Sequence, residues 1–175
     1  MITKDYRVPK SSIRGLNDEA TFWAVIEPIW PATEADDTLE HISEGTPGQR
    51  ALYATTLFMR EVDNGGLEQF FWNSGGKYSL EVLTGFQLLG MNRNAELVSK
   101  AFSFFPNSQV PLDWIERQQF LLSKGYNAPR GSHQVNHAEA FFEPINQQLY
   151  GEDKMFPYYK KYIEDHSEDF FLNED

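Results

Sequence analysis

The chain has 175 residues, of which 26 are acidic and 15 basic, and it carries a net charge of −11 and no cysteine. This length is enough for one domain with a sizeable core. The absence of cysteine excludes disulfides, thiol catalysis and Cys-ligated zinc. The excess of acidic residues argues against direct nucleic-acid binding, which needs a basic surface. No apolar run is long enough for a membrane span, and the start, MITKDYRVPK, lacks the apolar core of a signal peptide, so we expect a cytoplasmic protein.

The first part of the sequence predicts two helices. Asn17 is a good N-cap for a helix that runs toward Trp30, because its side chain can accept a bond from a free N–H group of the first turn. Pro28 should end or kink that helix, since proline has no N–H to donate. Thr46 followed by Pro47 is typical of the start of a second helix, whose apolar residues recur at helical spacing until DNGG ends the run.

Helical spacing continues through the rest of the chain, and alternating strand patterns are scarce. We expect further helices over residues 78–89, ended by Gly90; over 94–105, halted by Pro106; over 111–125; over 137–149, interrupted by Pro144; and from Met155 onward. No internal repeat is present. The sequence therefore predicts an all-α fold, a single compact domain over residues 1–175 with about seven or eight short helices.

Two of these helices have an apolar face that we expect to be buried. In the helix over 111–125, the residues on one face are Trp114, Ile115, Gln118, Leu121 and Leu122. In the last helix, they are Tyr159, Tyr162, Ile163, His166 and Phe170. Apolar residues at this spacing are typical of a helix that packs on a core.

The stretch NGGLEQFFWNSGG, residues 64–76, has a Gly-Gly pair near each end. It is not a phosphate-binding loop, because the Gly-Lys pair lacks both the glycine that should precede it and the Ser or Thr that should follow. A dinucleotide-binding turn would need a strand before the glycines, and a helix is expected there. We therefore expect the first glycines to turn the chain and a helix of about two turns to follow.

Most residues of this stretch are expected to have a structural role. Phe70 and Phe71 should enter the core, and Gln69 and Asn73 should bond backbone groups that lack helical partners. Glu68 and Trp72 point elsewhere, so Trp72 is a candidate for contact with another element or with a partner chain. The residues with a predicted structural role are Asn64, Gly65, Gly66, Gln69, Phe70, Phe71 and Asn73.

The same stretch resembles the signature Asn-Gly-Gly-hydrophobic-x-Gln-Phe-Phe-x-Asn of a bacterial family of domains of unknown function. The best-known characterised member of that family is a DNA-mimic protein. The resemblance covers residues 45–172, including the acidic tail YYKKYIEDHSEDFF. It implies an all-α fold, a possible homodimer and, in the characterised member, an acidic surface that occupies the DNA-binding face of a transcription factor.

The negative charge is concentrated toward the two ends of the sequence. Residues 1–50 hold 9 acids and 5 bases, residues 51–138 hold 7 of each, and residues 139–175 hold 10 acids and 3 bases. Carboxylates on a rigid element can compete with DNA phosphates for a stripe of Lys and Arg. The candidate partner-binding acids are Glu34, Asp36, Asp37, Glu40, Glu44, Glu164, Asp165, Glu168, Asp169, Glu174 and Asp175.

The last helix presents these acids in an unfavourable pattern. If it continues through Asp169, Glu164 lies one turn from Glu168 and Asp165 one turn from Asp169. Like charges at this spacing repel, and acids near a helix C-terminus oppose its dipole, so the cost could be retained for a partner. The alternative is an ordinary solvated chain end. On the partner hypothesis, neutralising all four acids should abolish binding and leave the fold intact.

Patterns that would indicate catalysis are weak. His133 and His137 are four residues apart, as metal ligands on a helix can be, but the segment before His137 is expected to be a loop and no HExxH follows. His166 falls on an apolar face and is expected to be a core residue, while His41 could pair with a neighbouring acid. No Gly-x-Ser-x-Gly elbow exists. We expect no cofactor and no metal.

Three classes of function remain open. The first is a non-enzymatic acidic protein, in its most specific form a DNA mimic that blocks a basic DNA-binding protein, either a transcription factor or a nucleoid protein. The second is an interaction or immunity-type module that binds through an aromatic surface, with Trp72 or the segment FPYYKKY as its anchor. The third is a hydrolase with a carboxylate or histidine site, which a stoichiometric metal would favour.

Overall fold

The computed structural model describes residues 5–30, 40–127, 136–149 and 155–173, and every named element in these ranges is a helix. The all-α prediction is confirmed. Seven of the described α-helices have nine or more residues, and α3 and α10 are short. The α-helices are α1 (Asp18–Ile26), α3 (Glu40–Glu44), α4 (Pro47–Trp72), α5 (Ser79–Leu88), α6 (Asn92–Phe102), α7 (Trp114–Ser123), α8 (His137–Leu149), α9 (Met155–Asp165) and α10 (Ser167–Phe170); the 3-10 turns are η1 (Lys10–Ile13), η2 (Ser74–Tyr78) and η3 (Pro106–Ser108).

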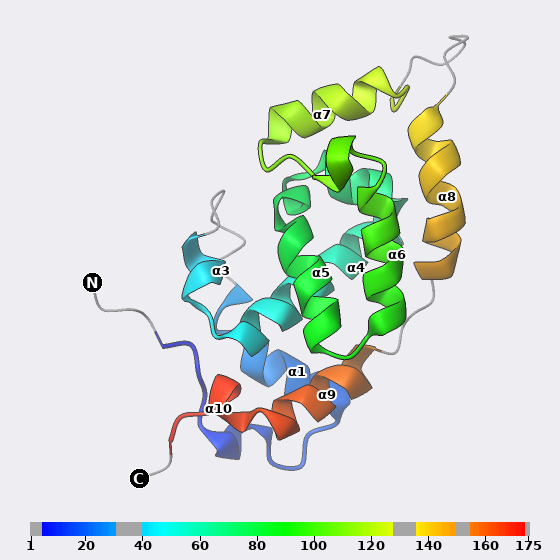
Figure 1. Cartoon of the computed structure of the whole chain (residues 1–175). Helices are drawn as coiled ribbons and strands as arrows, with labels where there is room; N and C mark the ends of the chain where they lie inside the picture. The colour runs from blue at the N-terminus through cyan, green and yellow to red at the C-terminus, as the bar shows by residue number, and fades with distance from the viewer. Residues whose placement is uncertain (1–4, 31–39, 128–135, 150–154, 174–175) are drawn as a thin grey trace.

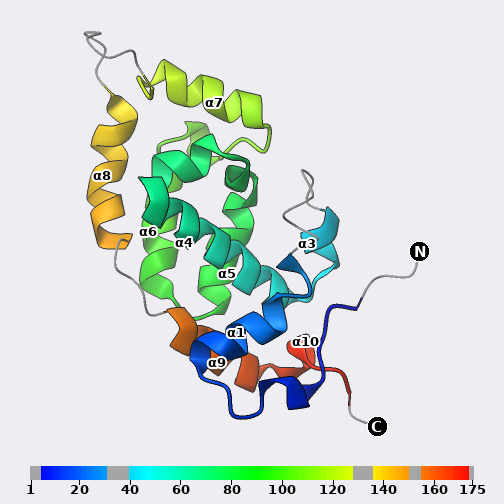
Figure 2. The same cartoon turned by 180° about the vertical axis from the view of Figure 1, so that it is seen from behind.

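Helix α4 runs through the middle of the molecule and contacts most of the other helices (Figure 1 and Figure 2). Helices α5 and α8 pack on it, α7 crosses one end of the molecule, and α1, α9 and α10 lie at the opposite end (Figure 1). At this second end the first and last described segments meet. Val8 N–H donates to the carbonyl of Phe170 at 2.9 Å, and Leu172 N–H donates to the carbonyl of Val8 at 3.0 Å.

The helices begin where local side chains can accept from their first N–H groups. Asn17 Oδ1 accepts from Ala20 N–H at 2.8 Å, and Thr46 forms a reciprocal capping box with Gln49. Both predicted N-caps are therefore confirmed. Pro28 lies just beyond the end of α1, as its missing N–H predicts.

Helix α4 breaks at the first Gly-Gly pair. Gly65 has φ −164° and ψ 26°, and Gly66 has φ 75° and ψ −178°, so the backbone leaves the helix and re-enters it on a new axis. A positive φ is costly for residues with a Cβ and nearly free for glycine. A Cβ at Gly66 would also lie 2.6 Å from Asn146 Nδ2 and 2.8 Å from Glu68 Oε2. The predicted turn and the helix of about two turns after it are present.

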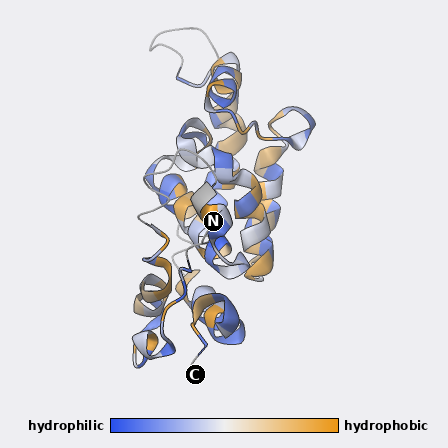
Figure 3. Cartoon of the chain, turned by 90° about the vertical axis from the view of Figure 1, so that its left-hand side faces the viewer, coloured by the Kyte–Doolittle hydropathy of each residue, from blue (hydrophilic) through white to orange (hydrophobic). Residues whose placement is uncertain are grey.

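The core is rich in aromatic residues, and hydrophobic and hydrophilic stretches alternate along the helices (Figure 3). Phe71 lies at its centre, with ring centroids 4.9 Å from Phe105 and 5.4 Å from Phe142. Phe70 packs edge-on against Phe58 at 4.9 Å. The two phenylalanines of the motif are both fully buried, and each such pair adds about 1 kcal/mol to the stabilisation from the area that it buries.

Three sequence-based boundaries were wrong. Helix α6 ends at Phe102, three residues before the expected end, because a turn replaces its last residues ahead of Pro106. Helix α7 begins at Trp114, where Asp113 caps it by accepting from Glu116 N–H at 2.8 Å. Helix α8 continues through Pro144 without interruption.

The last helix and α7 also differ from the expected pattern. The predicted continuous helix through 169 ends at Asp165, because His166 has φ −126° and ψ 52°, and a separate short helix α10 follows. His166 is exposed and stacks on Tyr162 at 4.2 Å, so it is not a core histidine. In α7 the buried residues are Arg117 and Leu121, whereas Ile115 and Leu122 face outward.

Two glycines with positive φ offer a matched stability test. Gly66→Ala should lower the free energy of unfolding by roughly 1–3 kcal/mol of backbone strain, because only glycine readily adopts φ 75° with ψ −178°, plus the cost of moving Asn146 and Glu68. Gly90→Ala is the control, because Gly90 has φ 71° but a Cβ added there would meet no atom within 4 Å. Urea denaturation of both variants measures the difference. Equal losses would contradict the expectation that the backbone and contacts of Gly66 cost more than a positive φ in open space.

Candidate functional site

Arg117 fastens α7 to the end of α4. Its guanidinium is fully buried and donates from Nε to the carbonyl of Phe71 at 3.0 Å and from Nη2 to the carbonyl of Asn73 at 2.9 Å. Nη1 donates to the carbonyls of Pro111 and Leu112, both at 2.8 Å. The last carbonyls of a helix lack partners within it and carry partial negative charge, so they replace the carboxylate that a buried arginine usually needs.

The carbonyl of Trp72, also at this end of α4, accepts from two other side chains of α7. Trp114 Nε1–H donates to the carbonyl of Trp72 at 2.7 Å, and Gln118 Nε2 donates to the same oxygen at 3.2 Å. The ring of Trp72 is half-buried and lies 5.1 Å from the ring of Tyr126. Trp72 therefore contacts another element of this chain, which is one of the two alternatives that its position in the motif predicted.

The two amides of the motif bind a single carboxylate across the kink. Gln69 Nε2 donates to Glu61 Oε2 at 2.7 Å, and Asn73 Nδ2 donates to the same oxygen at 2.9 Å. The expectation that these amides bond backbone groups is therefore wrong. The kink brings the helical turn that holds Glu61 opposite the new helix, and the motif side chains fasten the two axes to each other.

Glu68 is buried, contrary to the expectation that it points away from the core. It is 7% exposed, and its Oε2 accepts from Asn146 Nδ2 at 3.0 Å. Asn146 Oδ1 accepts from Leu67 N–H at 2.9 Å, next to the kink. Burial raises the pKa of the Glu68 carboxyl above its ordinary value, and Glu143 and Glu139 of α8 add to the rise, while the bond from Asn146 opposes it.

A polar groove runs along α4 beside these bonds. It consists of two adjoining hollows of about 760 and 610 Å³, and both are lined by Glu61 and Asn73. Asn64 and Gln69 line the first hollow, so three polar residues of the motif face this groove. The other lining residues are Trp30, Leu57, Arg60, Asp63, Ser74, Lys77, Leu112, Asp113, Trp114 and Arg117.

A second candidate region lies where the two acidic segments meet. Thr46 Oγ1 donates to the carbonyl of Asp169 at 2.9 Å, and Gly48 N–H donates to Asp169 Oδ2 at 2.8 Å. Asp169 thus caps the start of α4, where a negative charge is favourable. Glu44 is two residues from Thr46 and accepts a 3.4 Å bond from the Tyr6 hydroxyl. Acids from opposite ends of the sequence are therefore brought to one end of the molecule.

The predicted partner-binding acids differ in their surroundings. Glu164 and Glu168 are exposed, and Glu168 lies 3.8 Å from the His166 ring. Asp165 forms an ion pair with Lys161, and Asp169 holds α4 as described. Glu40 opens α3, and its side chain is not described; Glu34, Asp36, Asp37, Glu174 and Asp175 lie outside the described residues.

The structure gives no support to a metal centre in the described part of the chain. No group of three His, Asp or Glu side chains there could hold an ion. His137 is exposed at the start of α8, and His133 lies outside the described ranges, as do the side chains of His41 and Glu40.

Sequence reasoning missed Glu61, Arg117 and Asn146, which fasten the motif to the rest of the fold. Arg117 is four residues before Leu121, on the face of α7 that proved to be buried. Asn146 lies between Ile145 and the buried end of α8. A polar residue within an apolar stripe was the available signal, but its partners are distant in sequence and could not be read from it.

The chain belongs to the DMP19-like protein family, whose model matches residues 43–166. The family resemblance given by the motif is thereby confirmed over nearly the same range. No curated protein and no solved structure matches the chain significantly. Among the described helices, none combines the length and the apolar character that crossing a membrane requires.

The role of Asp169 can be tested by comparison with its neighbour. Asp169→Ala should lower the free energy of unfolding by about 1 kcal/mol, because Gly48 N–H loses its acceptor at the start of α4. Glu168→Ala should change it by less than about 0.5 kcal/mol, since Glu168 is exposed. Chemical denaturation of both variants measures this. A loss of equal size in both would mean that Asp169 does not cap the helix.

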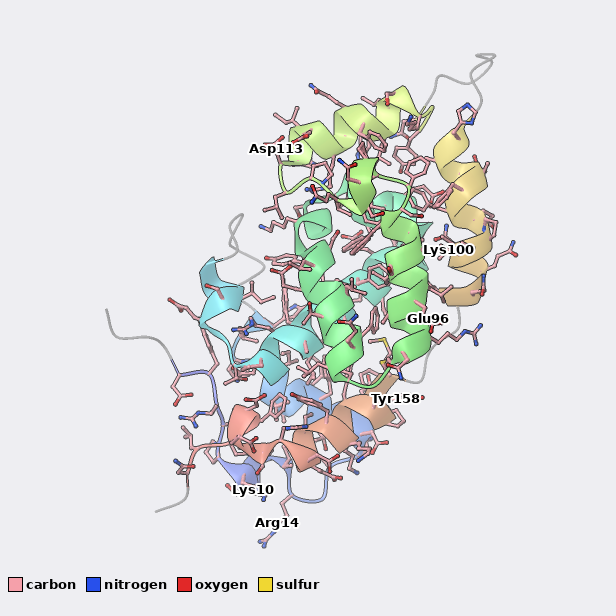
Figure 4. The ribbon with its side chains drawn as sticks, in the orientation of Figure 1. Lys10, Arg14, Glu96, Lys100, Asp113 and Tyr158 are labelled. Atoms are coloured by element: carbon pink, nitrogen blue, oxygen red, sulfur yellow. The ribbon has the colours of Figure 1, made fainter. Side chains whose placement is uncertain are left out.

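Glu68 should make stability depend on pH. Its carboxyl holds a proton more tightly in the folded chain than in the unfolded one, so the free energy of unfolding should fall as pH rises from about 4.5 through the raised pKa. Glu68→Gln keeps an acceptor for Asn146 and should flatten this part of the profile. Glu96→Gln is the control, because Glu96 is exposed on α6 (Figure 4). An unchanged slope in Glu68→Gln would contradict the assignment.

Proposed function

We propose that this protein is a non-enzymatic regulator that binds a basic protein through its carboxylates, and that it acts as a DNA mimic. The observation that supports this most directly is the pair of bonds from Thr46 and Gly48 to Asp169. These bonds bring α10 to the start of α4, beside α3. A charge track for a DNA-binding protein requires the acidic segments to adjoin, and Asp169 of the second segment contacts Thr46, two residues after Glu44 of the first.

The proposed surface consists of Glu44, Glu164 and Glu168, with Asp165 beside them. All are exposed, and Asp169 is excluded because it stabilises α4. Glu44, Glu164 and Glu168 form no ion pair with a lysine or arginine of the described chain. Three basic residues of this end are already engaged by other acids: Arg7 pairs with Asp5, Lys160 with Asp18 and Lys161 with Asp165. An arginine or lysine stripe of a partner would therefore meet carboxylates that form no ion pair with a lysine or arginine of the described chain, although Lys10 lines the same hollow as Glu168.

The family supports the same proposal. The motif resembles a family whose best-known characterised member occupies the DNA-binding face of a transcription factor, and this chain belongs to the DMP19-like protein family. Its net charge of −11 suits a basic partner. Contacts of this kind weaken as salt screens them, and duplex DNA should compete for the same partner surface.

The first test is capture of a partner. The immobilised protein is exposed to host lysate at low salt, and bound proteins are eluted with duplex DNA. Release of a DNA-binding protein by DNA would support mimicry. If bound proteins leave only in detergent or denaturant, the acidic surface is not the binding site and the proposal fails.

A charge-matched pair of variants tests the surface itself. The triple variant Glu44→Gln, Glu164→Gln, Glu168→Gln should weaken binding of the captured partner at least tenfold, which corresponds to about 1.4 kcal/mol, and should leave the fold intact. The control has the same net charge but changes exposed acids elsewhere: Glu27→Gln, Glu96→Gln, Glu116→Gln. Equal affinities of the two triple variants, measured by calorimetry, would rule out a specific role for this surface.

A second candidate function rests on the outer face of α7. Trp114, Ile115 and Leu122 of α7 are 53%, 61% and 45% exposed, and Leu112, just before α7, is 65% exposed. Exposed apolar side chains that lie close together commonly mark a protein interface. A module that binds a partner, or a second copy of this chain, through this face would tolerate salt. In that case Ile115→Asp should abolish binding while the triple acid variant leaves it unchanged.

A further inference from the structure

The polar groove along α4 contains three acceptor oxygens with no donor among the described residues. Glu61 accepts two bonds at Oε2 and none at Oε1, and the side chains of Gln69 and Asn73 have no bonds other than those to Glu61. Glu61 and Asn73 line both hollows of the groove, and Gln69 lines the larger one.

The orientation of the two amides follows from the chemistry of their shared partner. An ionised carboxylate only accepts hydrogen bonds, so Gln69 and Asn73 must both turn their NH₂ groups toward Glu61. Their carbonyl oxygens are then left as acceptors. The groove therefore offers a carboxylate oxygen and two amide oxygens in one small region, and it suits a ligand rich in donors.

We propose that this groove binds an arginine side chain of the protein partner. The inference rests on the proposed function, because a basic partner supplies the arginine. A guanidinium has five N–H donors in a planar fork, which can reach the carboxylate oxygen and both amide oxygens together. The hollows on either side, of about 760 and 610 Å³, leave room for the residues that flank the arginine.

The groups around the groove favour a cation at Glu61. Glu61 forms no ion pair in the described part of the chain. The cations that line the groove are directed to other groups: Arg60 lies over the Trp30 ring at 5.3 Å, Lys77 over the Tyr78 ring at 5.2 Å, and Arg117 donates to backbone carbonyls. Asp113 stands at the far end of the groove, at the start of α7 (Figure 4), and adds negative charge.

The test uses the full chain and a defined probe. N-acetyl-arginine methylamide is titrated into the ¹⁵N-labelled protein, and the side-chain NH₂ signals of Gln69 and Asn73 are followed by NMR. We expect both signals to shift in a saturable manner, with the lysine analogue binding at least about threefold more weakly because it lacks the planar fork. No saturable shift, or equal binding of the two probes, would overturn the inference.

A matched pair of variants locates the effect. Glu61→Gln should weaken binding of the arginine probe about tenfold, since it removes a charge-assisted bond, and Glu96→Gln should leave it unchanged. If Glu61→Gln unfolds, the wild-type titration with the two probes still decides. Equal weakening by both variants would show a general charge effect and overturn the site.

The outcome is separable from that of the proposed function. A partner that is captured and displaced by DNA, with no probe binding in the groove, would leave the proposed function standing and overturn this inference. Probe binding at Glu61, with Glu61→Gln also weakening the captured partner, supports both. A saturable arginine site without any DNA-displaceable partner would support the groove chemistry and overturn DNA mimicry.

Discussion

The buried guanidinium of Arg117 is the interaction on which the rest of the motif region depends. Desolvation lowers its pKa, and an isolated buried charge would cost several kcal/mol. The cost is offset because α4 ends at Trp72 inside the molecule, where the carbonyls of Phe71 and Asn73 accept from the guanidinium. The break at Gly66 changes the axis of the helical segment that ends in these carbonyls.

This arrangement explains why a single stretch holds so many unlike residues. Phe70 and Phe71 anchor the short helix in the aromatic core, while Gln69 and Asn73 fasten it to Glu61 on the preceding helical segment. Gly76 leaves room for the guanidinium of Arg117, because a Cβ at this position would lie 2.6 Å from Arg117 Nε. The same side chains that hold the two axes together also line a groove, so a change in ligation at the groove would act on the angle of the kink.

The sequence predicted those parts of the fold that depend on local rules. The caps at Asn17 and Thr46, the turn at the glycines and the helical class all follow from residues within one or two turns of each other. The outward face of α7 could not be predicted, because a buried arginine with backbone partners far away in sequence decides which side faces the core. The break at His166 was missed for a similar reason. The helix ends at Asp165, and the separate helix α10 places Asp169 against Thr46 and Gly48 at the start of α4, a contact that is distant in sequence.

The candidate sites likewise combine features that the sequence predicts with features that depend on tertiary contacts. Composition located the acidic ends, but only the tertiary bonds of Asp169 show that one acid is structural and that the two ends adjoin. The bond between Gly48 and Asp169 spans 121 residues, so its loop must close against a large entropy loss. The approach of the two acidic segments therefore depends on this tertiary contact, and a chain in which the contact is broken would carry the same charges without holding the segments together. On the proposed function, binding through this surface would accordingly require α10 to be packed against the start of α4.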